Sequence, residues 1–408
     1  MAEYNELVNA LSPEAHTFRI GPSDPRLAQC LEHFPSAVFT ECLYQSIELI
    51  ERYSIELAVD LSQQLDLPDQ LDEWRSAGEI SQRLSFQPPF KCALFWILER
   101  LVETGCAEAR GNGESRSYRL QHSLWEPDLK TLRAIGVSID PGNAATLDLL
   151  DYVAGLYPAA AKNQQSGDGN LLGPQGVPLW LKYFHNDNLT YAVNNWVAAI
   201  LAADRLSSRR TLRILEIGAG TGSGSEILLE SFAERGLLSR VERYLITEPN
   251  AYFRRCAQRN LAAKYPALPL EWAALDVDLP WQHQGVNATE FDLVYAVNVM
   301  HISKNLMFSL GEARSTLANH GWLVLGECVR PHDNQPIYPE FMFQILNSFT
   351  NVQTDPEFRP NPGFLTAEQW RRAFSRAGFT DAGFAPDIER IREIYPHFFT
   401  GAICGQNR

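Results

Sequence analysis

The chain has 408 residues, 45% of them hydrophobic and 21% charged, so it can hold two or three domains and is neither disordered nor fibrous. Its 35 Lys and Arg against 49 Asp and Glu give a net charge of −14, which disfavours nucleic acid as a substrate. The seven cysteines include no C-x-x-C pair, and no apolar run reaches membrane-spanning length. Residues 1–16 are acidic, unlike a secretory signal, so we expect a cytoplasmic protein with reduced thiols and no membrane partner.

Residues 1–140 are expected to form a mostly helical first domain. Apolar residues recur at helical spacing over 39–65, and shorter helices are expected over 77–84 and 92–103. Two alternating segments around the Gly111-Asn112-Gly113 turn follow, which predicts a β-hairpin and a winged-helix-like arrangement. Because residues 71–103 carry five acidic and four basic side chains, a packing or homodimerisation module is favoured over a DNA-binding one.

Residues 141–206 are expected to form a helical linker or lid. A Gly/Ser/Gln-rich break over 161–176 precedes an apolar and aromatic segment at helical spacing that contains several asparagines. Tyr183, Asn188, Tyr191 and Asn195 could cover a cofactor and hydrogen-bond an acyl carbonyl. An ordinary amphipathic helix with polar caps explains the same residues equally well.

Residues 207–408 alternate short apolar strands with amphipathic helices from Thr211 onward. This pattern predicts an α/β domain with a parallel, doubly wound, Rossmann-like sheet. Thr366 and Gln369 have the spacing of a capping box at the start of a helix, and two further strands are expected over 381–387 and 397–406.

The first strand of this sheet leads into a glycine-rich loop. Glycines are needed at such a turn because the chain bends sharply and a ligand approaches the backbone. A dinucleotide fingerprint would require a third glycine where Ser223 stands. The pattern E-x-G-x-G-x-G fits at each position, with Glu216, Gly218, Gly220 and Gly222.

Two acidic residues follow the next strands in order. Glu248 ends the second strand, where a carboxylate can accept hydrogen bonds from both ribose hydroxyls. Asp276 and Val277 end the third strand, where they could bind and pack an adenine ring. The order of glycine loop, acid and second acid predicts a site for S-adenosylmethionine, and Asn298 after the fourth strand is expected to contact this cofactor.

These motifs resemble those of class I S-adenosylmethionine-dependent methyltransferases, over residues 213–330: ILEIGAGTG is the glycine motif, TEP the ribose motif and LDVD the adenine motif. The segments FDLVYAVNVMHISKN and GWLVLGECV further resemble the C-methyltransferase domains of polyketide synthases. The resemblance implies transfer of a methyl group to an activated carbon of an acyl or ketide substrate, carried as a thioester on an acyl carrier protein.

A carbon nucleophile must lose a proton, and imidazole titrates in the range that suits a general base. His301 follows the fourth strand and Glu327 lies on the neighbouring fifth strand, so their side chains should meet. The resemblance implies that His301 is the base and Glu327 its orienting partner. The alternatives are a packing histidine and a solvated carboxylate.

Other functions remain open from the residues alone. A small-molecule O-methyltransferase could use the same histidine on a hydroxyl, and a cofactor-sensing regulator could bind DNA through the wing. His332, Asp333, Gln335 and Gln344 could hold a divalent metal with His301, although a solvated loop is the favoured interpretation. The identity of any metal is not predicted.

Overall fold

The computed structural model describes residues 25–162 and 167–408, which form two compact units. Unit 1 contains residues 40–183 and 330–351, and unit 2 contains residues 25–39, 184–329 and 352–408. The acidic opening segment 1–16 and residues 163–166 of the Gly/Ser/Gln-rich break lie outside the described residues. Within the described ranges, no helix combines the length and the apolarity needed to cross a bilayer.

Unit 1 is mainly helical. Its long helix α3 (Glu41–Gln64) begins where the Thr40 hydroxyl accepts a hydrogen bond from the Leu43 amide, and most of its residues are buried. The other helices are α4 (Ala77–Arg83), α5 (Lys91–Glu103), α6 (Leu129–Ile139), α7 (Asn143–Ala154), α8 (Tyr157–Ala161), α9 (Gly167–Leu171), α10 (Val177–Tyr183), α15 (Tyr338–Phe341) and α16 (Asn347–Thr350).

A small antiparallel sheet accompanies helices α4 and α5 in unit 1. Its strands β1 (Arg75–Ser76), β2 (Ala107–Arg110) and β3 (Ser117–Leu120) have the order β1-β3-β2. Helix α4 starts with a capping box in which Ser76 and Glu79 bond reciprocally to each other's backbone amides. The hairpin β2–β3 turns around the segment that the sequence predicted.

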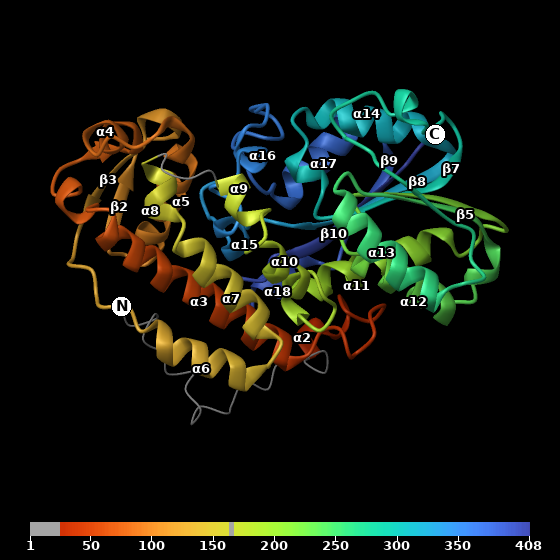
Figure 1. The fold of residues 1–408 in the computed structure, drawn as a ribbon, viewed down its shortest axis with the longest axis horizontal. Coiled ribbons are helices and arrows are strands. Elements are labelled where there is room, and N and C mark those ends of the chain that lie inside the picture. The colour runs from red at the N-terminus through yellow and green to blue at the C-terminus, as the bar shows by residue number, and fades with distance from the viewer. Residues whose placement is uncertain (1–24, 163–166) are drawn as a thin grey trace. The chain divides into compact units, whose positions relative to one another are not determined.

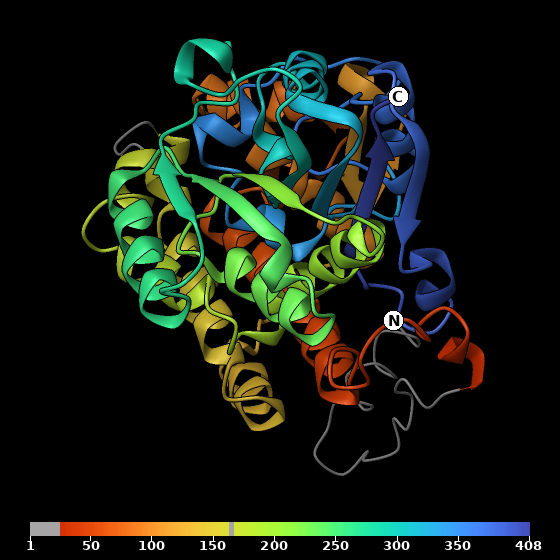
Figure 2. The same ribbon diagram turned by 90° about the vertical axis from the view of Figure 1, so that its right-hand side faces the viewer.

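Unit 2 is built on a seven-stranded sheet with the order β6-β5-β4-β7-β8-β10-β9 (Figures 1 and 2). The strands are β4 (Leu212–Ile217), β5 (Val241–Thr247), β6 (Leu270–Ala273), β7 (Phe291–Val297), β8 (Leu317–Cys328), β9 (Thr380–Ala385) and β10 (Thr400–Gln406). The five neighbouring strands β6-β5-β4-β7-β8 all pair in parallel, which confirms the expected α/β, Rossmann-like sheet. The two C-terminal strands were also predicted, but β10 pairs antiparallel with both β8 and β9, so the sheet is mixed.

Helices cover both faces of this sheet (Figure 1). On one face lie α11 (Leu189–Leu206), α12 (Ser223–Glu234) and α13 (Ala251–Lys264); on the other lie α14 (Leu306–Thr316) and α17 (Ala367–Arg376). Helix α17 begins with the predicted capping box of Thr366 and Gln369. Short helices α2 (Pro25–Ala28) and α18 (Ile388–Arg392) complete the unit. The face under α14 and α17 is closed by a continuous apolar core that includes Leu215, Leu310 and Trp370.

Candidate active site

The glycine loop follows β4 at the carboxyl edge of the parallel strands. Gly218, Gly220 and Gly222 all have positive φ, at +66°, +56° and +88°, which explains the residue type at these positions. A Cβ on Gly218 would lie 2.6 Å from a methyl group of Val299, so this residue must be small for the loop to approach the turn after β7.

Gly220 differs from Gly218 in its surroundings. A Cβ on Gly220 would meet no protein atom within 4 Å, so the loop backbone borders open space at this residue. Helix α12 begins directly after the loop at Ser223, so the positive end of its dipole also lies at this edge. The residues therefore form a cradle of backbone groups that fits a nucleoside ligand and that a side chain at position 220 would fill.

Glu216, predicted to bind the cofactor, is buried beneath this loop. Its Oε2 atom accepts hydrogen bonds from the Ser225 hydroxyl and the Tyr244 hydroxyl, both at 2.6 Å. Burial raises the pKa of Glu216 to about 7, although the two hydroxyl donors oppose this change. These contacts join β4, β5 and α12 under the cradle.

The raised pKa of Glu216 predicts how stability depends on pH. The folded state holds this proton more tightly than the unfolded state, so stability falls as pH rises from about 4.5 to about 7. The total loss is about 3 kcal/mol, of which about 1 kcal/mol falls between pH 6 and 8. We expect Glu216→Gln to flatten this part of the profile, measured by urea denaturation at several pH values. An unchanged slope would contradict the assignment.

Glu248 ties the loop to the end of β5. Its Oε2 atom accepts a hydrogen bond from the Gly220 amide at 2.9 Å, and its Oε1 atom accepts one from the Asn250 amide at 2.8 Å. Burial raises the pKa of this carboxyl group. Each carboxylate oxygen has a second lone pair, so Glu248 can also accept from hydroxyl groups of a ligand in the cradle.

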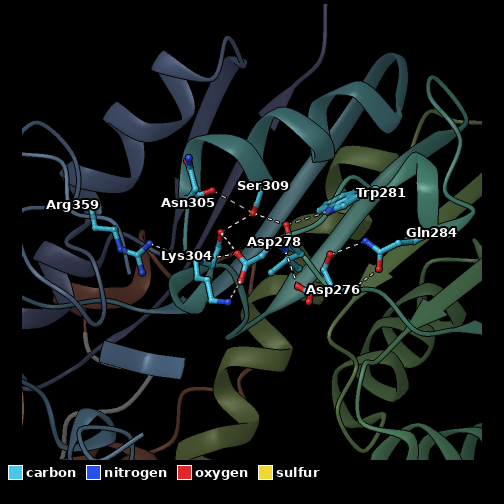
Figure 3. Close-up of polar contacts among 10 residues, drawn as sticks. Asp276, Asp278, Trp281, Gln284, Lys304, Asn305, Ser309 and Arg359 are labelled. Atoms are coloured by element: carbon cyan, nitrogen blue, oxygen red, sulfur yellow. Dashed lines mark hydrogen bonds and ion pairs between the residues drawn. The ribbon is translucent and has the colours of Figure 1, made fainter. Parts of the chain in front are cut away.

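The three remaining residues predicted to bind the cofactor lie on loops at the same edge. Asp276 is exposed and follows β6 by three residues rather than ending it; the Gln284 side chain bonds to its backbone amide and carbonyl (Figure 3). Val277 packs against the apolar core. Asn298 has φ +53°, and its Oδ1 atom accepts a hydrogen bond from the Cys328 amide at 3.0 Å.

His301 and Glu327 meet as the strand order predicted. His301 lies in the 3₁₀ helix η6 (Met300–Ile302) after β7, and Glu327 lies near the end of β8, which pairs with β7. The His301 Nδ1 atom is 2.7 Å from Glu327 Oε2, and the Met300 amide donates to Glu327 Oε1 at 3.0 Å. The side chains are only 3% and 2% exposed, so water competes little for this hydrogen bond. Glu327 therefore orients the imidazole and selects the tautomer with the proton on Nδ1.

The turn that carries His301, residues 300–304, is also fixed by residues that the sequence did not reveal. Asp278 Oδ1 accepts from the Lys304 amide at 2.8 Å (Figure 3), and the Gln353 amide donates to the Lys304 carbonyl at 2.8 Å. Arg359 donates to the carbonyls of His301 and Ser303. No sequence signal connects Gln353 or Arg359 to this turn, because they lie in an irregular loop about 50 residues away.

The four predicted lid residues fall into different parts of the structure. Tyr183 ends α10 in unit 1, where its ring contacts Trp180 edge to face. Asn188 precedes α11 in unit 2 and accepts a hydrogen bond from Thr190. On the same helix, the Tyr191 hydroxyl lies 3.1 Å from the Ser223 hydroxyl and Asn195 donates to Asn186, so α11 contacts the start of α12 beside the cradle.

The residues considered for a metal belong to two units. His332, Asp333, Gln335 and Gln344 lie in unit 1, whereas His301 lies in unit 2. Over residues 25–162 and 167–408, no three His, Cys, Asp or Glu side chains are grouped so that they could hold a metal ion.

Comparison with known proteins relates this fold to methyltransferases. Residues 215–323 match the family model described as a methyltransferase domain. The crystal structure of the CurJ carbon methyltransferase matches with a TM-score of 0.75 and 25% identity, covering 94% of this chain and 97% of that one. The DszA carbon methyltransferase matches with a TM-score of 0.72 and 22% identity, covering 97% and 96%, which supports the shared fold.

Sequence relatives are much longer proteins. The highly reducing polyketide synthase ALT1 of Alternaria alternata is 33% identical over 183 residues, which are 43% of this chain and 6% of that protein. The polyketide synthase PksR of Bacillus subtilis is 27% identical over 280 residues, 67% of this chain and 11% of that protein. The chain thus spans about a tenth or less of these relatives. The comparisons support the methyltransferase interpretation with S-adenosylmethionine as cofactor, and they do not favour the O-methyltransferase or DNA-binding alternatives.

Proposed function

We propose that this chain, a class I S-adenosylmethionine-dependent methyltransferase similar to the polyketide synthase carbon methyltransferases, methylates an activated carbon of an acyl or ketide substrate. When bound, S-adenosylmethionine supplies an electrophilic methyl group on a sulfonium centre. The chain's own residues then have three tasks. They bind the nucleoside, orient the acceptor carbon and remove its proton.

The pair of His301 and Glu327 carries this proposal. With Nδ1 hydrogen-bonded to Glu327, the Nε2 atom of His301 accepts the proton from the carbon between the two carbonyl groups of a β-ketoacyl thioester. The carboxylate stabilises the imidazolium ion that results, because the pair is buried at 2.7 Å. The acceptor carbanion forms on the substrate, and its charge is delocalised over the adjacent carbonyls.

Cofactor binding is assigned to the cradle beside this pair. We assign the ribose hydroxyls to Glu248 and the adenine to Asp276 and Val277, with Gly218, Gly220 and Gly222 providing backbone contact. Glu216 does not contact the cofactor in this assignment; it supports the cradle by linking β4 to β5 and α12 through hydrogen bonds. Asn298 holds the turn between the cradle and His301 through its bond to the Cys328 amide. The chain's proposed lid residues are Tyr183, Asn188, Tyr191 and Asn195.

The substrate is proposed to arrive as a thioester on an acyl carrier protein, as the polyketide synthase relatives suggest. For residues 75–120 we propose a winged-helix-like module, based on α4, α5 and the β2–β3 hairpin. The nearly equal charges of residues 71–103, five acidic and four basic side chains, favour protein packing, including homodimerisation, over contact with DNA.

The proposed function is tested with the purified chain, deuteromethyl-labelled S-adenosylmethionine and a β-ketoacyl pantetheine thioester. We expect the label on the carbon between the carbonyl groups, detected by mass spectrometry and located by NMR. A phenol serves as the competing acceptor. Label on oxygen in either acceptor, with none on carbon, would contradict C-methylation.

A further inference from the structure

Arg359 is a buried arginine whose contacts are unusual for a buried charge. Its side chain is fully buried, and it forms no ion pair with any carboxylate among the residues that the structure describes. Instead, Nη1 donates to the Ser303 carbonyl at 2.6 Å and Nη2 donates to the His301 carbonyl. Burying a guanidinium without a directly bonded carboxylate costs desolvation free energy. A functional role for Arg359 would explain why the chain keeps a charge at this position.

The segment around Arg359 is itself held firmly. Arg359 and Asp355 exchange two backbone hydrogen bonds of 2.8 Å, and the neighbouring Phe358 is packed in the apolar core. Phe364, a little further along, lies with its ring 4.3 Å from the imidazole of His301. The loop therefore contacts both the backbone and the ring of His301, and the backbone that carries Arg359 is itself fixed. Figure 3 shows the Arg359 side chain beside the turn that includes Lys304.

Charges around this turn are arranged so that Arg359 stays a cation. Burial lowers the pKa of Arg359 to about 10, with Glu327 and Asp278 opposing the change through their negative charges. The guanidinium is therefore protonated at neutral pH. The guanidinium donates to two carbonyl groups and attracts the Glu327 carboxylate electrostatically without a direct bond. At the other end of the turn, Asp278 accepts from the Lys304 amide and lies 4.0 Å from the Lys304 ammonium group.

We propose that Arg359 is a positioning residue for the transfer reaction: by holding the carbonyls of His301 and Ser303, it sets the direction of the His301 imidazole. This inference rests on the proposed function of His301 as the base. The two planar N–H groups of a guanidinium can bind two carbonyls at once in a fixed geometry, which an ammonium group reproduces only in part. Glu327 orients His301 through a hydrogen bond to the ring, and Arg359 orients it through a hydrogen bond to the backbone carbonyl.

The test compares Arg359→Met and Arg359→Lys with a matched control, Arg392→Met. Arg392 is also largely buried and also donates to backbone carbonyls, those of Phe398 and Val329. For Arg359→Met we expect kcat to fall about 10- to 100-fold, because a small misplacement of a catalytic group has an effect of this size. KM should change little, since substrate binding is retained, and Arg359→Lys should recover part of kcat.

A second measurement does not depend on turnover. NMR of histidine labelled with ¹⁵N reports the Nδ1 proton of His301, assigned by its absence in His301→Gln. We expect this resonance to move in Arg359→Met and to stay in place in Arg392→Met. Equal effects of Arg359→Met and Arg392→Met on thermal stability, with kcat and the resonance unchanged, would overturn the inference. If the wild-type chain methylates no carbon but the resonance still moves in Arg359→Met alone, the proposed function fails, whereas the orientation of His301 by Arg359 is supported.

Discussion

Replacing His301 with alanine is expected to lower the rate of methyl transfer to carbon by about 10²- to 10⁴-fold, the range of a positioned general base. The buried His301 side chain is hydrogen-bonded to Glu327, so its loss removes both the proton acceptor and the partner of a buried carboxylate. The measurement is single-turnover transfer to the β-ketoacyl thioester. Binding of S-adenosylhomocysteine, followed by calorimetry, should persist, because the Gly220 cradle does not include His301.

Two further variants sharpen this result. Glu327→Gln keeps a hydrogen-bond acceptor but loses the charge that stabilises imidazolium, so we expect a smaller loss than in His301→Ala. In the double variant His301→Ala/Glu327→Gln, the two losses of methyl-transfer rate should not add, because the two residues act as one unit. His283→Ala, at an exposed position of the same unit, is the control. Full transfer by His301→Ala would remove the histidine from the mechanism.

Replacing Glu248 with alanine is expected to weaken binding of S-adenosylhomocysteine by about 10- to 100-fold. A hydrogen bond to a charged group contributes about 1.5–3 kcal/mol, and Glu248 holds the Gly220 amide as well as the proposed ribose contacts. Calorimetric titration gives the affinity directly. Glu248→Gln keeps one acceptor oxygen and should lie between wild type and alanine.

The control for this experiment is Glu271→Gln on the neighbouring strand β6. Glu271 is exposed and pairs with Arg243, so its charge should matter little for the affinity. Unaltered binding of S-adenosylhomocysteine by Glu248→Ala would refute the ribose assignment. Binding of NADH by the wild-type chain, with no binding of S-adenosylhomocysteine, would refute the choice of cofactor.

The parts of unit 2 that were predicted correctly are those whose structure is determined by residues close together in the sequence. Strand β4, the glycine loop and helix α12 follow from an apolar run, three glycines that need positive φ and an amphipathic segment. The meeting of His301 with Glu327 followed from the rule that parallel strands end at one edge. The capping box at Thr366 was equally local.

Features that depend on distant contacts were not predicted. The antiparallel pairing of β10 with β8 depends on where a strand is inserted in the sheet, which its residue pattern does not encode. Arg359 lies in a loop without periodicity, and only the folded chain brings it to the carbonyl of His301. Residues 330–351 follow β8 in sequence but pack in unit 1, where Tyr157 stacks on Phe341.

The position of β10 between β8 and β9 affects how the chain folds during translation. Strand β9 emerges from the ribosome before β10, yet it has no partner in the sheet until β10 is inserted. Until residues 400–406 have emerged, the edge of β8 keeps unpaired backbone groups and can pair with other nascent chains. Unit 2 therefore completes its sheet only after its last strand, β10, has been synthesised.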